Sequence, residues 1–329
     1  MDDDVVAEIL SRLPAKAVLR CRAVCRSWRR ITTTAYFVAA HSRRRPLQLL
    51  GYTGLAVESS SPPPPYNYVF TRNTSGADGV LICNPATRQL VNLPPANAAD
   101  SGRWKRLRPS AFYFHRPSGE HLVLCYRNGD NYILSISSGG ESRRLGPVPD
   151  HQQRVCSYFC VKFGVTVGDT VYWGRRQTDD RSQMMAFDTV SETFRRVAPP
   201  PPVSHADEGP MFDMHGALAL TAMSTEPYMD VWITAEDAAS GANWVRLLRV
   251  ELPPGHYSDE LKPHGFGKAV LDDAGVLLVA MTGFPSFLYD TKGRRMASCS
   301  HRINGFLWLF SYRESLLKVK TSQANSIIG

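Results

Sequence analysis

The stretch that decides the N-terminal fold is "EILSRLPAKAVLRCRAVCRSWRRI", residues 8–31. Apolar residues around its start recur at steps of one, three and four positions and form one stripe of a short helix: Val5, Val6, Ile9, Leu10 and Leu13. Pro14 ends this helix and suits the first turn of the next one, where a missing N–H costs no hydrogen bond. Val24, Trp28 and Ile31 continue an apolar stripe on a third helical piece. The pattern predicts a three-helix unit.

This helical unit is too small to bury all of its apolar residues. A unit of residues 1–45 lies near the lower size limit for an independent core. We expect Trp28 to lie at the packed centre of the unit. The apolar surface that is left over predicts a partner protein that covers it.

Positive charge is concentrated in the same segment. Residues 1–45 carry ten Lys and Arg against four Asp and Glu, a net charge of +6, out of +8 for the chain. The arginines Arg26, Arg29, Arg30 and Arg43 to Arg45 suit either a phosphate-contacting face or a nuclear address. The alternative, which we favour, is that they form the solvated face and end of the helical unit.

The sequence changes character after Pro46. Short apolar runs rich in Val, Tyr, Phe and Trp take over, each bounded by Gly, Pro, Asp, Asn or Ser, which predicts an all-β region. Two proline runs, Pro62 to Pro65 and Pro199 to Pro202, are incompatible with strand interiors. We expect them to be exposed loop crossings rather than ligands for a peptide-binding module.

One scheme recurs in the β region. A strand, a turn rich in Asn or Asp, and an outgoing strand occur within Gly79–Pro95, Gly168–Pro201 and Gly275–Met296. Asn and Asp suit such turns because their side chains bond the backbone two residues on. The turns near Asn84, Asp188 and Asp290 are spaced by about two periods of a 40–50-residue blade. The spacing predicts a β-propeller of about six blades.

Composition restricts the class of protein. With 43% hydrophobic and 21% charged residues, the chain is typical of a globular protein rather than a disordered one. The acidic stretch "MDDDVVAEIL" lacks the basic start of a signal peptide, so we expect a cytoplasmic or nuclear protein. The seven cysteines, including the pairs Cys21/Cys25 and Cys156/Cys160, are then expected to be reduced and not zinc ligands.

Enzyme motifs are missing from the sequence. It contains no G-x-S-x-G elbow, no H-E-x-x-H pair and no complete P-loop. His205, Asp207, Asp213 and His215 lie close together in sequence and raise the possibility of a metal-assisted site, against which we favour a polar loop. We therefore predict no catalytic residues, no metal and no cofactor.

The N-terminal stretch closely resembles the F-box, in which "eILsRLP", "llR" and "VCksWr" recur before an aromatic residue, here Phe37. The β region resembles the F-box-associated domain of plant F-box proteins, a kelch-like propeller. Its motifs are "NPATRQLVNLPP" (84–95), "GDTVYWG" (168–174) with "MAFDTVSETFRRV" (185–197), "DVWITAEDAASGANWVRL" (230–247) and "YRESLLKV" (312–319). The resemblance covers almost the entire chain.

The resemblance implies an α+β multidomain protein with an F-box over residues 1–45 and a substrate-recognition propeller over residues 46–329. It further implies a substrate-recognition adaptor of an SCF-type cullin–RING ubiquitin ligase, which is not itself an enzyme. The F-box docks on the small adaptor subunit of the ligase, and the propeller binds an unknown target protein for ubiquitination.

Eight residues match the F-box pattern and are our candidates for its fold and docking face. They are Ile9, Leu10, Leu13, Pro14, Leu19, Val24, Cys25 and Trp28. For Ile9 and Val24 in particular, a role in the core alone is the alternative to docking. The other function we weigh is a propeller-based interaction protein with a basic, nucleic-acid-binding helical unit and no ligase role. No membrane contact is expected.

Overall fold

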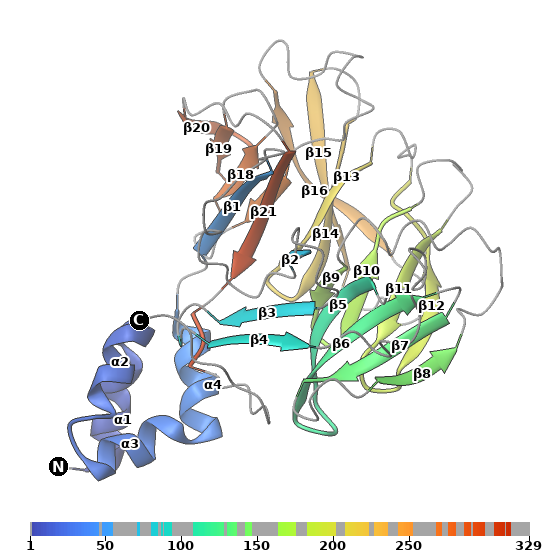
Figure 1. Ribbon diagram of the computed structural model, residues 1–329. Helices are drawn as coiled ribbons and strands as arrows, with labels where there is room; N and C mark the ends of the chain where they lie inside the picture. The colour runs from blue at the N-terminus through green and yellow to red at the C-terminus, as the bar shows by residue number, and fades with distance from the viewer. Residues whose placement is uncertain are drawn as a thin grey trace.

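The computed structural model describes four helices, all within the N-terminal unit (Figure 1). Their bounds are α1 Asp3–Ser11, α2 Ala15–Cys21, α3 Arg26–Thr33 and α4 Ala35–Arg44. The structure describes residues 2–45, 48–54, 71–72, 80–84, 87, 89–93, 108–127, 130–136, 142–146, 164–175, 183–201, 208–223, 227–235, 243–252, 268–271, 276–280, 286–290, 292–299, 306–312 and 314–316.

Local chemistry places the helix boundaries. The Asp2 carboxylate accepts a hydrogen bond from the Asp4 N–H at 3.3 Å and caps α1. Pro14 precedes α2, as predicted from its ring. The Cys25 Sγ accepts from the Trp28 N–H and caps α3. The fourth helix, which the sequence pattern did not indicate, begins after Thr34, whose Oγ1 accepts from the Phe37 N–H at 3.2 Å.

The strands of the described residues form six antiparallel sheets. Three sheets come from the first half of the β region. They are β2 (Thr71–Arg72) with β3 (Val80–Asn84) and β4 (Gln89–Leu93); β5 (Arg108–His115), β6 (Glu120–Arg127), β7 (Asp130–Ser135) and β8 (Ser142–Gly146); and β9 (Val165–Val167), β10 (Thr170–Trp173), β11 (Met184–Asp188) and β12 (Thr193–Val197).

The other three sheets complete the β region. They are β13 (Glu208–Met214), β14 (Ala217–Met223), β15 (Tyr228–Thr234) and β16 (Trp244–Glu251); β17 (Lys268–Leu271), β18 (Leu277–Ala280), β19 (Ser286–Tyr289) and β20 (Arg295–Cys299); and the pair β1 (Gln48–Gly54) with β21 (Phe306–Tyr312). The β1–β21 pair joins the two ends of the β region, with Gln48 opposite Tyr312 and Gly54 opposite Phe306.

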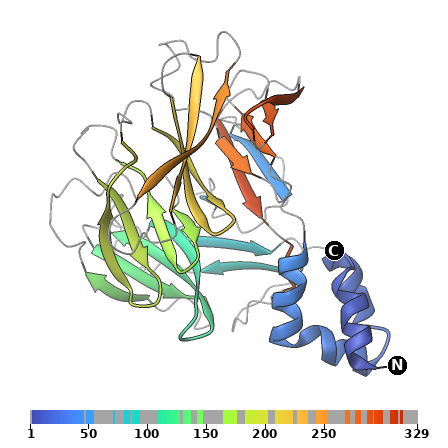
Figure 2. The ribbon, with the colours of Figure 1, turned by 180° about the vertical axis from the view of Figure 1, so that it is seen from behind.

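The sheets follow one another in chain order. The first strand of each four-stranded sheet contacts the first strand of the next, from β5 to β9, β13 and β17, and β17 then contacts β21. The four-stranded sheets thus pack against one another in chain order, and Figure 2 shows the same succession from behind. The number and order of the sheets confirm the predicted propeller of about six blades.

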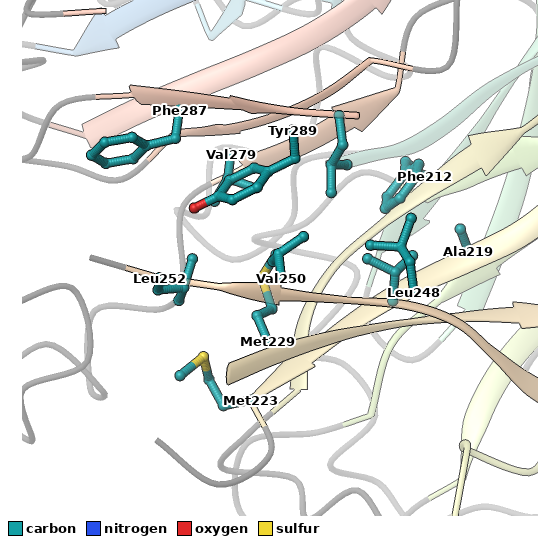
Figure 3. Close-up of a cluster of buried hydrophobic side chains, with 12 residues drawn as sticks. Phe212, Ala219, Met223, Met229, Leu248, Val250, Leu252, Val279, Phe287 and Tyr289 are labelled. Atoms are coloured by element: carbon teal, nitrogen blue, oxygen red, sulfur yellow. The ribbon is translucent and has the colours of Figure 1, made fainter. Parts of the chain in front are cut away.

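Buried side chains form clusters that join adjacent sheets. Figure 3 shows Phe287 and Tyr289 of β19 facing side chains of the preceding sheet, including Val250 of β16. The Tyr289 hydroxyl also donates to the Glu251 carbonyl at 3.0 Å. One sheet further back, the Trp244 Nε1–H donates to the Ala198 carbonyl at 2.8 Å. These contacts tie each blade to the next.

The turn chemistry predicted for the blades is confirmed at two positions. The Asp188 carboxylate accepts from the Val190 N–H at 2.9 Å and closes the β11–β12 turn. The Asp290 carboxylate accepts from the Lys292 N–H at 2.9 Å and closes the β19–β20 turn. Pro199 to Pro201 follow β12 outside any strand, as expected, but Pro200 is buried, so the expected exposure is wrong there; Pro202 and Pro62 to Pro65 lie outside the described residues.

Candidate partner-binding surface of the helical unit

The helical unit has a core of its own. Six of its side chains pack together there: Val6, Leu10, Ala15, Val18, Ile31 and Phe37. Leu10 is 1% exposed, so its role is in the core and not on a docking face. Of the two roles expected for the candidates, fold and docking, Leu10 therefore serves the fold, because α1 turns this side chain toward α2 and α3.

Ile9 and Val24, for which a role in the core alone was the alternative to docking, lie on the surface. Ile9 is 51% exposed on α1, and Val24 is 66% exposed between α2 and α3. Ile9 directly precedes the buried Leu10, and a step of one residue rotates a side chain by about 100° around a helix. Both apolar groups are therefore accessible to a partner, and the interpretation of Ile9 and Val24 as core is wrong.

The remaining candidates divide into two groups. Pro14 and Cys25 are exposed, whereas Leu13, Leu19 and Trp28 are half-buried at the margin of the core. Trp28 thus packs against the cluster without occupying its centre, which Leu10, Ile31 and Phe37 fill. The expectation of a central Trp28 is wrong, because α4, which the sequence pattern did not indicate, supplies Phe37 in its place.

Two exposed apolar residues were missed by the sequence reasoning. Val5 lies one helical turn before Ile9 and is as exposed as Ile9, and Tyr36 on α4 is 81% exposed. The one-turn spacing of Val5 and Ile9 was the available signal, since residues four apart share a helix face. The exposed apolar surface of the helical unit therefore comprises Val5, Ile9, Val24 and Tyr36.

Several arginines bind groups inside the helical unit. Arg12 Nη2 and Arg44 Nη1 lie 2.9 and 2.7 Å from the Glu8 carboxylate, and these two guanidinium groups lower the pKa of Glu8. Arg45 Nη2 donates to the Arg12 carbonyl at 2.9 Å and so satisfies the C-terminal end of α1. Two of the three consecutive arginines therefore hold α4 against α1.

Other cations of the basic segment are also engaged. Arg30 forms an ion pair with Asp3, and Ser27 donates to the same carboxylate at 3.2 Å. Arg22 is buried and donates to the Thr32 carbonyl at 2.6 Å. These contacts favour the structural interpretation of the arginines over a phosphate-contacting face, because engaged guanidinium groups are less available to nucleic acid.

No metal site appears among the described residues, where no group of three or more His, Cys, Asp or Glu is close enough to hold an ion. Of the cluster considered from the sequence, His205 and Asp207 lie outside the described residues. The Asp213 carboxylate accepts from the Gly216 N–H at 2.8 Å and shapes the β13–β14 turn, on which His215 is exposed. These two residues therefore form a polar turn.

None of the helices in the described part of the chain combines the length and the apolar character needed to cross a bilayer.

Comparison with known proteins assigns both parts of the chain. Residues 1–38 match the family described as F-box domain, and residues 67–281 match the one described as F-box associated beta propeller domain. F-box protein At5g18160 of Arabidopsis thaliana is 26% identical over 279 residues, which cover 76% of this chain and 70% of that protein. F-box/LRR-repeat protein At2g43260 of the same plant is 26% identical over 284 residues, covering 70% of this chain and 63% of that protein.

Solved propellers resemble the chain only distantly. The Cps50 (Swd1) beta-propeller domain of Myceliophteria thermophila is 8% identical, with a TM-score of 0.34, over 68% of this chain and 81% of that one. The assignment therefore comes from the two family matches and from the order of the sheets. The chain belongs to the plant F-box proteins that carry an F-box-associated β-propeller domain.

Proposed function

We propose that this protein is the substrate-recognition subunit of an SCF-type cullin–RING ubiquitin ligase. The helical unit docks on the small adaptor subunit, and the propeller holds a target protein for ubiquitination. In this role the protein binds two partners and performs no chemistry, and it acts in the cytoplasm or nucleus. The observation that carries the proposal is an F-box match on a folded helical unit that exposes large apolar side chains.

Exposed apolar residues suit a protein interface. Val5, Ile9, Val24 and Tyr36 are large groups that water solvates poorly, and such groups supply most of the affinity where a partner buries them. Lys16, Arg20, Arg26 and Arg43 are exposed cations of the same unit. We therefore expect the adaptor to present an apolar centre with acidic residues around it.

The test uses a matched pair of substitutions in the full-length chain. Val24→Asp places a charge in the proposed interface, whereas Val190→Asp places the same charge on an exposed valine in the β11–β12 turn of the propeller. Titration calorimetry with the purified adaptor subunit measures both. We expect Val24→Asp to weaken binding at least about tenfold, because a buried unpaired charge is costly, and Val190→Asp to bind like the wild type.

Two results contradict the proposal in different ways. If the wild-type chain does not bind the adaptor, the ligase role is wrong. If the wild type binds and both variants bind equally well, the ligase role stands, but the docking face does not include Val24. Circular dichroism of both variants controls for folding, which we expect to be retained because both valines face solvent.

A further inference from the structure

Three residues that follow the last strand contact both parts of the molecule. Glu314, Ser315 and Leu316 come directly after β21 and lie about 300 positions from the helices in sequence. In Figure 1 the helical unit lies beside the ends of β3 and β4, and Asn84 at the end of β3 contacts Ser315. The segment therefore lies where the two parts meet.

Glu314 completes the start of α2. The N-cap residue of this helix is Pro14, whose side chain has no acceptor and so makes no capping hydrogen bond. The Ala15 N–H instead donates to the Glu314 Oε2 at 3.0 Å. A carboxylate at this position satisfies a free N–H and faces the positive end of the helix dipole. Glu314 thus replaces the missing cap from the far end of the chain.

Leu316 completes the core of the helical unit. Its side chain is 1% exposed and packs in the cluster formed by Val6, Leu10, Ala15, Val18, Ile31 and Phe37. It is the only member of this cluster, as the structure describes it, that does not come from the four helices. For a unit with so few buried residues, one leucine is a substantial part of the core.

Ser315 contacts the propeller. Its carbonyl accepts a hydrogen bond from the Asn84 Nδ2 at 3.1 Å, and Asn84 is itself buried at the end of β3. The backbone between Glu314 and Leu316 therefore bonds the propeller, while the side chains of those two residues contact the helices. One short segment therefore binds the helices through two side chains and the propeller through its backbone.

We infer that Glu314–Leu316 is a structural part of the helical unit and fastens that unit to the propeller. The folding unit at the N-terminus is then residues 2–45 together with residues 314–316, and not a continuous stretch of sequence. It follows that changes at the far end of the chain loosen α1, α2 and α3. This inference is independent of the ligase role.

Hydrogen exchange in the full-length protein tests the inference directly. Leu316→Ala removes the buried side chain, and Leu247→Ala makes the same substitution at an exposed position of β16. Peptides from α1 to α3 report on the helical unit, and peptides from β14 and β15 report on the propeller. We expect Leu316→Ala to speed exchange in the helices at least about 25-fold, the lower end for a buried Leu→Ala change. Leu247→Ala should leave the helices unchanged.

Variants at Glu314 test the second contact. Glu314→Ala removes the acceptor for the Ala15 N–H and should speed exchange in α2 about fivefold, in line with loss of a helix cap. Glu314→Gln keeps an acceptor oxygen and should have a smaller effect. Leu316→Met preserves most of the buried volume and should behave much like the wild type.

Two outcomes would overturn the inference. Equal helix exchange in Leu316→Ala and Leu247→Ala would show that the helices do not need the segment. An equal increase in the helices and in β14–β15 would assign Leu316 to the stability of the whole molecule rather than to the helical unit. If Leu316→Ala does not fold, Glu314→Ala and Glu314→Gln carry the same comparison with a milder change.

Discussion

The helical unit and the propeller solve the problem of burying apolar side chains in opposite ways. In the propeller, the buried residues of the four four-stranded sheets join clusters that span neighbouring sheets. The helical unit has a single cluster and depends on Leu316 from the other end of the chain. Successive sheets therefore cover one another's apolar faces, whereas a few short helices leave large apolar groups exposed.

Ion pairs join neighbouring elements in both regions. Ion pairs in the helical unit join helix to helix, as with Arg44 and Glu8. In the propeller they also join blade to blade: Arg116, after β5, lies 2.9 Å from Asp169, after β9. Within one blade, Arg249 of β16 binds the buried Asp230 of β15 through both of its oxygens, at 2.6 and 2.9 Å. Polar contacts in both regions thus reinforce packing.

The largest expected effect concerns an aromatic residue buried between two blades of the propeller. Phe187 on β11 is fully buried and lies with its ring centroid 5.8 Å from that of Tyr113 on β5. Phe187→Ala should lower the free energy of unfolding by about 3–5 kcal/mol, because it leaves a cavity between two blades. Urea denaturation measures the change, and Phe114→Ala on the exposed side of β5 serves as the control. A similar loss in both variants would contradict the packing described for the two blades.

The next effect separates two neighbouring residues of α1. Leu10→Ala should destabilise the helical unit by about 2–5 kcal/mol because Leu10 is buried. Ile9→Ala should change its stability by no more than about 0.5 kcal/mol because Ile9 faces solvent. Hydrogen exchange of α1 and α3 compares the two variants. If Ile9→Ala costs as much as Leu10→Ala, the orientation of α1 is wrong.

Acid should weaken the propeller through one histidine. His121 on β6 packs between Phe112 and Phe114, and burial lowers its pKa to about 4, from 6.5. The unfolded chain binds this proton more readily than the folded protein does. Protonation of His121 therefore costs no stability above pH 6.5, and the free energy of unfolding falls as the pH drops from 6.5 toward 4. The full loss is about 3 kcal/mol.

Thermal denaturation of the wild type and His121→Phe between pH 7 and pH 4 checks this expectation. The wild type should lose stability relative to His121→Phe as the pH drops from 6.5 toward 4. Carboxylates titrate equally in both proteins, so they do not change this difference. Two parallel curves would show that His121 does not contribute. Burial also lowers the pKa of His41 in the helical unit, so the protection of α4 amides, corrected for the intrinsic exchange rate at each pH, should fall with acid in both proteins alike.

The smallest effect concerns the helix that the sequence pattern did not indicate. Thr34→Ala removes the Oγ1 that accepts from the Phe37 N–H and should destabilise α4 by about 1 kcal/mol. Thr34→Ser keeps a hydroxyl and is the matched control. Exchange at the start of α4 reports the difference. A Thr34→Ser variant that loses as much as Thr34→Ala would show that the hydroxyl does not cap this helix.

Much of the fold was predictable from local patterns. The spacing of apolar residues indicated α1 and α3, Pro14 marked the start of α2, and Asp188 and Asp290 marked turns. These features depend on neighbours within a few positions, which the sequence contains directly. The candidate residues were grouped by their motif, but the motif did not divide them into buried and exposed members, and the structure places Leu10 in the core and Ile9 and Val24 on the surface.

Short-range patterns were enough to predict α1 to α3 and the change to strands in the β region, though not α4, because propensity, periodicity and turn chemistry act over a few residues. Only the tertiary structure decided which face of α1 is covered, because Val5/Val6 and Ile9/Leu10 are equally apolar pairs and packing selects one member of each. It also decided that Glu314 caps α2 and that Leu316 completes the helical core. Those contacts join residues about 300 positions apart, and they form because the β1–β21 pair brings the two ends of the β region together.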